Sequence, residues 1–187
     1  MIFPNPTVWS EHRLAWIALS VRVFCLILTQ THFVPDEYWQ CLEPAHRLTF
    51  GYGYLTWEWH RGLRSYFHPL LIAWCYKILG LLRMDTVFAV IMVPRLLQTL
   101  CSTLGDIYLY KLTKRLYGQP VALWTFVTYL VSWFAGYTSS RTLANSTETV
   151  LLIVGLYLYA WPQDYIHPAK HRTVSHGASC DVSQIKG

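Results

Sequence analysis

Residues 116–140 read LYGQPVALWTFVTYLVSWFAGYTSS, a stretch without a single charged side chain. Three further runs, residues 14–34, 86–105 and 149–163, hold only two charges between them, Arg22 and Arg95. Each run approaches the ~20 apolar residues that a helix needs to cross a bilayer. The sequence therefore predicts an all-α polytopic membrane protein with about four transmembrane helices.

The composition of the 187-residue chain supports a membrane protein. Hydrophobic residues make up 53% and charged residues 13%, whereas about a quarter of a typical soluble domain is charged. The net charge of +5 comes from scattered Lys and Arg rather than from a basic stripe, so it indicates no nucleic-acid partner. The first apolar run is long, bulky and followed by no small-residue cleavage site, which predicts an uncleaved anchor rather than a signal peptide.

The charges between the apolar runs predict how the chain crosses the membrane. Lys111, Lys114 and Arg115 follow the second span, and such clusters favour the cytoplasmic side. With spans at 14–31, 87–110, 121–137 and 149–161 and a cytoplasmic N-terminus, residues 32–86 form a first luminal loop. Within it, residues 65–82 are apolar, and we expect a helix that begins and ends on the luminal side, a further crossing being the alternative.

The first luminal loop combines aromatic and charged residues, a mixture typical of a membrane interface. Pro35 to Leu48 is expected to be helical, because Pro35 suits a helix start and Asp36 and Glu37 complement the helix dipole. Gly51 and Gly53 then end the helix. Asp36 and Glu37 have two interpretations at this stage: a general base at the membrane surface, or an ordinary acidic first turn.

A second polar cluster follows the third span. Arg141, Asn145 and Glu148 have the spacing i, i+4, i+7 and are predicted to share one helix face. Arg141 is a candidate to neutralise a phosphate at a luminal cavity. The alternative is that it flanks the membrane helix and pairs with Glu148.

We assign residues 1–161 to the membrane module and residues 162–187 to a polar tail. The tail is rich in His, Ser, Lys and Pro, has no apolar periodicity and is expected to be disordered. Its potential zinc ligands lack a supporting fold, so no metal site is predicted. These residues are His167, His171, His176 and Cys180.

Several motifs resemble a known enzyme family. They read FVPDEYWQ at 33–40, GYGYLTWEW at 51–59, LRSY at 63–66, PRLLQ at 94–98 and RTLANSTET at 141–149. The chain resembles the dolichyl-phosphate-mannose-dependent mannosyltransferases of glycosylphosphatidylinositol (GPI) anchor biosynthesis, which belong to the GT-C superfamily. One departure is Val34, which stands where the wider family usually has a histidine.

The resemblance implies a GT-C-type module in the endoplasmic reticulum membrane that adds the third mannose of the GPI precursor in an α-1,2 linkage, with inversion. Asp36 is implied as the base, with Glu37 as the runner-up or as a group that orients the acceptor. Arg64 or Arg141 would stabilise the leaving phosphate. The remaining implied substrate contacts are Trp57, Glu58, Trp59 and Glu148. The partners implied are the lipid-linked donor, the GPI-lipid acceptor and the bilayer, with no cofactor, metal or nucleic acid.

Two other functions are weighed against this one. The chain could be a non-catalytic membrane protein that retains the family's first module, because family members continue into further membrane helices whereas this chain turns into the polar tail. A small transporter or channel is disfavoured, because no charged residue lies near the middle of a span except Arg22 and Arg95.

Overall fold

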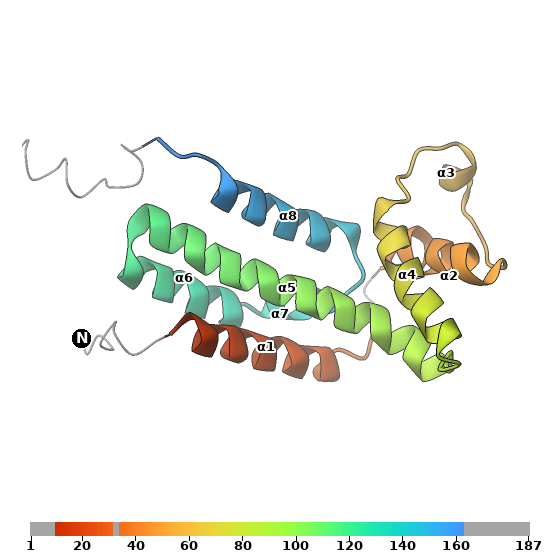
Figure 1. Ribbon diagram of the computed structural model, residues 1–187, viewed down its shortest axis with the longest axis horizontal. Helices are drawn as coiled ribbons and strands as arrows, with labels where there is room; N and C mark the ends of the chain where they lie inside the picture. Colours follow the sequence, from red (N-terminus) through yellow and green to blue (C-terminus); the bar gives the residue numbers. More distant parts are fainter. Residues whose placement is uncertain (1–9, 32–33, 163–187) are drawn as a thin grey trace, which may run out of the picture.

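The computed structural model describes residues 10–31 and 34–162, and every regular element within these ranges is a helix (Figure 1). The all-helical prediction is therefore confirmed for the described residues. The predicted disordered tail, with its His and Cys residues, lies outside them from residue 163 onward. The elements are α1 (Glu11–Leu28), the π-helix η2 (Tyr38–Leu42), α2 (Glu43–Phe50), α3 (Trp57–His60), α4 (Phe67–Leu81), α5 (Val87–Tyr117), α6 (Gln119–Val131), α7 (Trp133–Thr138) and α8 (Ala144–Leu158).

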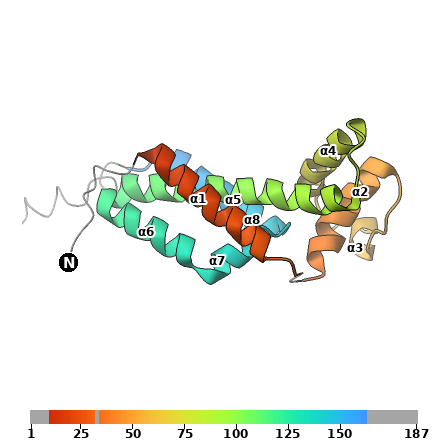
Figure 2. The same ribbon diagram turned by 90° about the horizontal axis from the view of Figure 1, so that it is seen from below.

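Helix α5 is the long axis of the molecule, and the helices α1, α6, α7 and α8 lie alongside it (Figures 1 and 2). We call these five helices the helix bundle. Its apolar centre joins α1, α5 and α6, with the Tyr110 and Phe126 rings in an edge-on contact at 6.0 Å between centroids. The buried residues of this centre are Leu14, Ala18, Tyr110, Ala122 and Phe126.

Residues 34–82 pack together at one end of α5, and we call them the loop unit (Figure 1). They have an apolar centre of their own, formed by η2, α2 and α4. The Tyr76 hydroxyl donates to the Val90 carbonyl at 3.1 Å and so ties α4 to the start of α5. The buried residues of this centre are Cys41, Ala45, Ile72, Ala73, Tyr76 and Leu79.

The helix boundaries follow local chemistry. The Ser10 and Thr86 side chains accept hydrogen bonds from the first turns of α1 and α5, as N-cap residues do. The chain is helical from Asp36 to Phe50 through η2 and α2, which confirms the helix expected from Pro35. It ends at Gly51, whose φ of 82° lies in the left-handed region that glycine adopts at little cost.

Among the residues that the structure describes, one helix, α5, is long and apolar enough to cross a membrane. Its 31 residues correspond to about 46 Å at ~1.5 Å per residue, more than the ~30 Å of a bilayer's hydrocarbon core. Helices α4, α6 and α8 are apolar but shorter. Helix α1 has 18 residues and carries Glu11, Arg13 and Arg22.

Two sequence-based expectations about helices are wrong. The span predicted over 121–137 is interrupted at Ser132, whose ψ of 116° separates α6 from α7. The interruption accompanies a close approach of α7 to α1, where a Cβ on Gly136 would lie 3.2 Å from the Cys25 sulfur. Arg141 does not share a helix face with Asn145 and Glu148, because α8 begins only at Ala144, after an extended Leu143.

Candidate functional site

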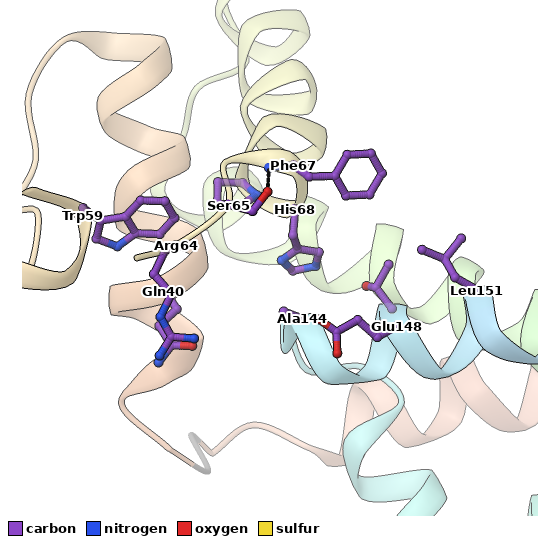
Figure 3. A pocket seen from close by; sticks show the side chains of 11 residues that line it. Gln40, Trp59, Arg64, Ser65, Phe67, His68, Ala144, Glu148 and Leu151 are labelled. Carbon is purple, nitrogen blue, oxygen red and sulfur yellow. Dashed lines mark hydrogen bonds between the residues drawn. The ribbon is translucent and has the colours of Figure 1, made fainter. Parts of the chain in front are cut away.

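A pocket of about 210 Å³ lies where the loop unit meets the start of α8 (Figure 3). Its volume is below the ~300–1,000 Å³ of pockets for drug-sized ligands, so it has room for a single small group such as one sugar or one phosphate. The loop unit contributes Gln40, Trp59, Arg64 and His68, and α8 contributes Thr147 and Glu148. Three of the predicted site residues, Trp59, Arg64 and Glu148, are therefore brought together.

Arg64 is the cation of this pocket. Gly62, with a φ of 68°, turns the chain after α3, and the Arg64 Nε then donates to the Glu58 carboxylate at 2.7 Å. This hydrogen bond raises the pKa of Arg64, and the nearby Asp36 carboxylate adds a smaller effect in the same direction. The guanidinium remains 40% exposed, so it can still contact an anion.

The two acidic residues of the FVPDEYWQ motif have different surroundings. Asp36 is exposed and lies one helical turn before Gln40, which lines the pocket. Glu37 is buried, and its carboxylate accepts a hydrogen bond from the Arg141 Nη1 at 2.8 Å. The π-helix that follows at Tyr38 is a rare form often found at functional sites. Only Asp36 of the pair faces solvent.

Arg141 lies in the turn before α8 and is fully buried. In addition to its ion pair with Glu37, its guanidinium carbon lies 4.0 Å from the centre of the Tyr137 ring. Arg141 does not line the pocket. The structure thus uses this residue to hold the acidic motif against the helix bundle.

The two tryptophans of the GYGYLTWEW motif differ in exposure, as Asp36 and Glu37 do. Trp59 is buried, donates its indole N–H to the Trp39 carbonyl at 3.0 Å, and packs on Tyr66 with ring centroids 4.6 Å apart. Trp57 is 66% exposed and does not line the pocket. Of the two tryptophans, only Trp59 can present its ring to a group in this pocket.

His68 is a pocket residue that sequence reasoning missed. It lies in the first turn of α4, with its Nδ1 3.0 Å from the Cys41 sulfur. Burial lowers the pKa of His68, and burial also raises the pKa of the Cys41 thiol, so both groups are neutral near pH 7. The only sequence signal is a lone His three residues after the Ser65 that belongs to the LRSY motif.

The chemistry available at the pocket is that of acid–base and phosphate recognition. The Arg64 guanidinium, the His68 imidazole and the Glu148 carboxylate line one small cavity. The exposed Asp36 carboxylate does not line it but lies near enough to Arg64 to raise the pKa of that residue. Among residues 10–31 and 34–162, no group of three His, Cys, Asp or Glu side chains is placed to hold a metal ion. The arrangement suits a transfer reaction in which a base acts on a hydroxyl and a cation faces an anionic leaving group.

Comparisons with known proteins agree with the motifs. Residues 14–180 match the model of the Alg9-like mannosyltransferase family. The chain is 52% identical over 141 residues to GPI alpha-1,2-mannosyltransferase 3 of Bos taurus, covering 75% of this chain and 26% of that protein. It is 49% identical over 155 residues to a mannosyltransferase of Arabidopsis thaliana, covering 83% of this chain and 28% of that protein.

A third relative, GPI mannosyltransferase 3 of Drosophila melanogaster, is 46% identical over 156 residues, 82% of this chain and 27% of that protein. No solved structure matches the chain. The chain spans about a quarter of the length of these curated relatives. The family match covers most of the chain, and the chain belongs to the Alg9-like mannosyltransferase family.

Proposed function

We propose that the chain provides the first module of a GPI α-1,2-mannosyltransferase of the endoplasmic reticulum membrane. The reaction is transfer of the third mannose from dolichyl-phosphate mannose to the GPI precursor. The relatives' names support this activity. The observation that carries it is the exposed Asp36 carboxylate beside a pocket whose cation is Arg64.

Asp36 acts as the general base in this proposal. It removes the proton from the acceptor's 2-hydroxyl as that oxygen attacks the anomeric carbon of the donor mannose. The bond between the anomeric carbon and the phosphate oxygen breaks, and dolichyl phosphate leaves with the bonding electrons. Attack on a β-linked donor from the opposite face gives an α product, so one base suffices and no covalent intermediate forms.

Arg64 and Glu37 take different parts. Arg64 stabilises the charge that develops on the leaving phosphate, because its guanidinium is partly exposed at the pocket. Glu37 is a positioning residue, because its buried ion pair with Arg141 fixes the turn that carries Asp36. The buried Arg141 acts on the phosphate only through this support.

The helix bundle is proposed to lie in the membrane with the loop unit on the luminal side. Helix α5 supports this placement by its length and apolar character. Helices α1, α8 and the interrupted pair α6 and α7 are proposed as the other three spans. Their exposed side chains are largely apolar, as for example Trp16, Phe24, Trp124 and Leu152.

The direct test is mannose transfer by a chimaera in which residues 14–159 replace the matching segment of the bovine relative. Asp36→Asn is expected to lower the rate by about 10²- to 10⁴-fold, the usual contribution of a general base. Asp85→Asn is the matched control, because Asp85 is also exposed but, unlike Asp36, is not among the groups that shift the pKa of Arg64. Normal transfer by Asp36→Asn would refute the assignment of the base.

The alternative is a non-catalytic membrane protein that retains the family's first module. The chain itself is assayed in membranes that lack endogenous activity, with dolichyl-phosphate mannose and a two-mannose GPI precursor. Transfer would establish the module as sufficient. No transfer by the chain together with an active chimaera would favour the non-catalytic form.

A further inference from the structure

A second cavity, of about 390 Å³, lies inside the helix bundle. It is enclosed by α1, α5, the α6–α7 interruption and the start of α8, and it meets the surface at the exposed Asn145 and Thr149. The two pockets lie on opposite sides of α8: Thr147 and Glu148 line the first, whereas Asn145, Ser146 and Thr149 line the second. A ligand chain that crosses the beginning of α8 could therefore reach both.

The inner wall of this cavity holds a buried ion pair. The Arg22 Nε and Nη2 each donate to the Asp106 carboxylate at 2.8 Å, and both side chains are 1% exposed. The Arg22 Nη1 is buried and has no hydrogen-bond partner among the described residues. The cavity thus presents one unused N–H donor from a pair whose net charge is zero.

Several hydroxyl groups of the remaining polar wall have already donated their protons. Ser102 donates to the Ser139 carbonyl, Thr138 to Phe134 and Thr149 to Asn145, at 2.8 to 2.9 Å. The oxygens of these hydroxyls keep free lone pairs, so they can only accept from a ligand. The wall therefore mixes these acceptors with donors, which are the Arg22 Nη1 and the side chains of Tyr129, Ser132, Asn145 and Ser146.

This pattern discriminates between classes of ligand. A phosphate is an anion, and its charge would have no compensation in this cavity, because Arg22 is already paired with Asp106. An amine offers only donors and leaves the Arg22 Nη1 without a partner. An uncharged sugar ring offers hydroxyls that both donate and accept, and its size suits the volume, which lies within the range of ligand pockets.

We infer that this second cavity is a carbohydrate subsite that holds one uncharged hexose of the acceptor glycan while the reacting sugar occupies the first pocket. The inference rests on the proposed function for the identity of the glycan. Binding of a hexose in the cavity, however, is measurable without any transfer. The subsite would position the acceptor by binding energy remote from the reacting atoms.

The test is binding of methyl α-D-mannopyranoside to the purified chain in lipid nanodiscs, followed by saturation-transfer NMR. Thr149→Val and Thr138→Val each remove one acceptor oxygen with little change of shape, and each is expected to raise the dissociation constant by about 2- to 12-fold, the value of one hydrogen bond. Thr125→Val is the matched control, because its hydroxyl also donates to the carbonyl four residues earlier, at 3.0 Å, but lies outside the cavity.

In the active chimaera, the same two variants are expected to raise the KM for the acceptor and to leave kcat and the KM for the donor unchanged. The inference is overturned if the mannoside does not bind, if it binds both valine variants as tightly as the unmodified chain, or if inorganic phosphate competes with it at a Thr149-dependent site. Inactivity of the chimaera with Thr149-dependent mannoside binding would instead refute the proposed function alone. Arg22 is left unchanged, because its removal would leave Asp106 buried and unpaired.

Discussion

The helix bundle and the loop unit use charge in opposite ways. In the bundle the charged pair Arg22 and Asp106 is almost completely buried, and the surrounding helices expose large apolar side chains. In the loop unit Asp36 is exposed and Arg64 is partly exposed beside a small pocket. The difference indicates that substitutions of charged residues should act mainly on stability in the bundle and mainly on activity in the loop unit.

The Glu37–Arg141 ion pair does not fit this difference between the bundle and the loop unit, because it is buried and joins the two. Arg141 belongs to the connection between α7 and α8, whereas Glu37 belongs to the FVPDEYWQ motif of the loop unit, and their atoms meet at 2.8 Å. The pair is nearly as inaccessible as the Arg22–Asp106 pair. Loss of this pair should therefore lower stability, as expected for a charged pair of the bundle. It should also lower activity, as expected for charged residues of the loop unit.

The largest expected effect is that of Arg141→Ala, which leaves the Glu37 carboxylate buried without its ion-pair partner. Loss of one partner of a buried pair typically costs about 3–5 kcal/mol in the free energy of unfolding. The measurement is unfolding in detergent micelles followed by circular dichroism, together with limited proteolysis of the loop unit. Arg61→Ala, an exposed arginine of the same loop unit, is expected to change stability by less than about 0.5 kcal/mol.

A double variant removes the charge of Glu37 as well as that of Arg141. The double variant Arg141→Ala and Glu37→Gln is expected to recover part of the lost stability, because the buried group that remains is uncharged. Activity should not recover in the chimaera, since the turn that carries Asp36 has lost its anchor. Equal stability of the single and double variants would show that the ion pair does not set the position of the motif.

A smaller effect is expected within the bundle from Gly105→Ala. A Cβ on Gly105 of α5 would lie 2.9 Å from the Val150 Cγ2 of α8, so the two helices would have to separate. Overpacking of this kind costs about 1–3 kcal/mol. Gly155→Ala on α8 is the matched control, because its Cβ would meet no atom within 4 Å. Val150→Ala combined with Gly105→Ala should restore stability, and a failure to do so would contradict the packing argument.

Local sequence patterns predicted where most of the helices lie, but they did not predict which distant segments make contact. The helix after Pro35 and its end at Gly51 depend on neighbouring residues, and both were predicted. The partnership of Glu37 with Arg141 joins residues 104 positions apart, and that of Arg22 with Asp106 joins residues 84 positions apart. Such pairs carry no local signal, so their existence follows only from how the helices pack.

The same reasoning explains the errors around the site. The break at Ser132 lies in a stretch without a neighbouring glycine or proline on either side, so hydropathy suggested one continuous helix. His68 was overlooked because it stands at the start of an apolar run, and its contact with Cys41 comes from another helix. Of the predicted site residues, Trp59, Arg64 and Glu148 line the first pocket. The others do not, and they are Asp36, Glu37, Trp57, Glu58 and Arg141.

The smallest expected effect tests whether the pocket of the loop unit is built around a neutral imidazole. Burial lowers the pKa of His68 below its ordinary value, so the unfolded chain binds a proton there more readily than the folded chain. The neutral ring makes its full contribution to the free energy of unfolding at pH values above the ordinary histidine pKa of about 6.5. This contribution is lost as the pH falls through the lowered pKa of His68 in the folded chain. Acidification from pH 7.5 to 5.5 should therefore destabilise the chain more than it destabilises His68→Gln.

Comparison with the variant isolates the titration of His68, because every other titratable group is present in both proteins. His60→Gln is the matched control, because it also removes a histidine of the loop unit but at an exposed position outside the pocket. If the unmodified chain and His68→Gln lost stability in parallel, the pKa of His68 would not differ between the folded and unfolded chains, and if the unmodified chain lost less stability than the variant, the ring would be protonated in the folded state. The pocket would then carry a second cation beside Arg64, and the phosphate role assigned to Arg64 would have to be shared with His68.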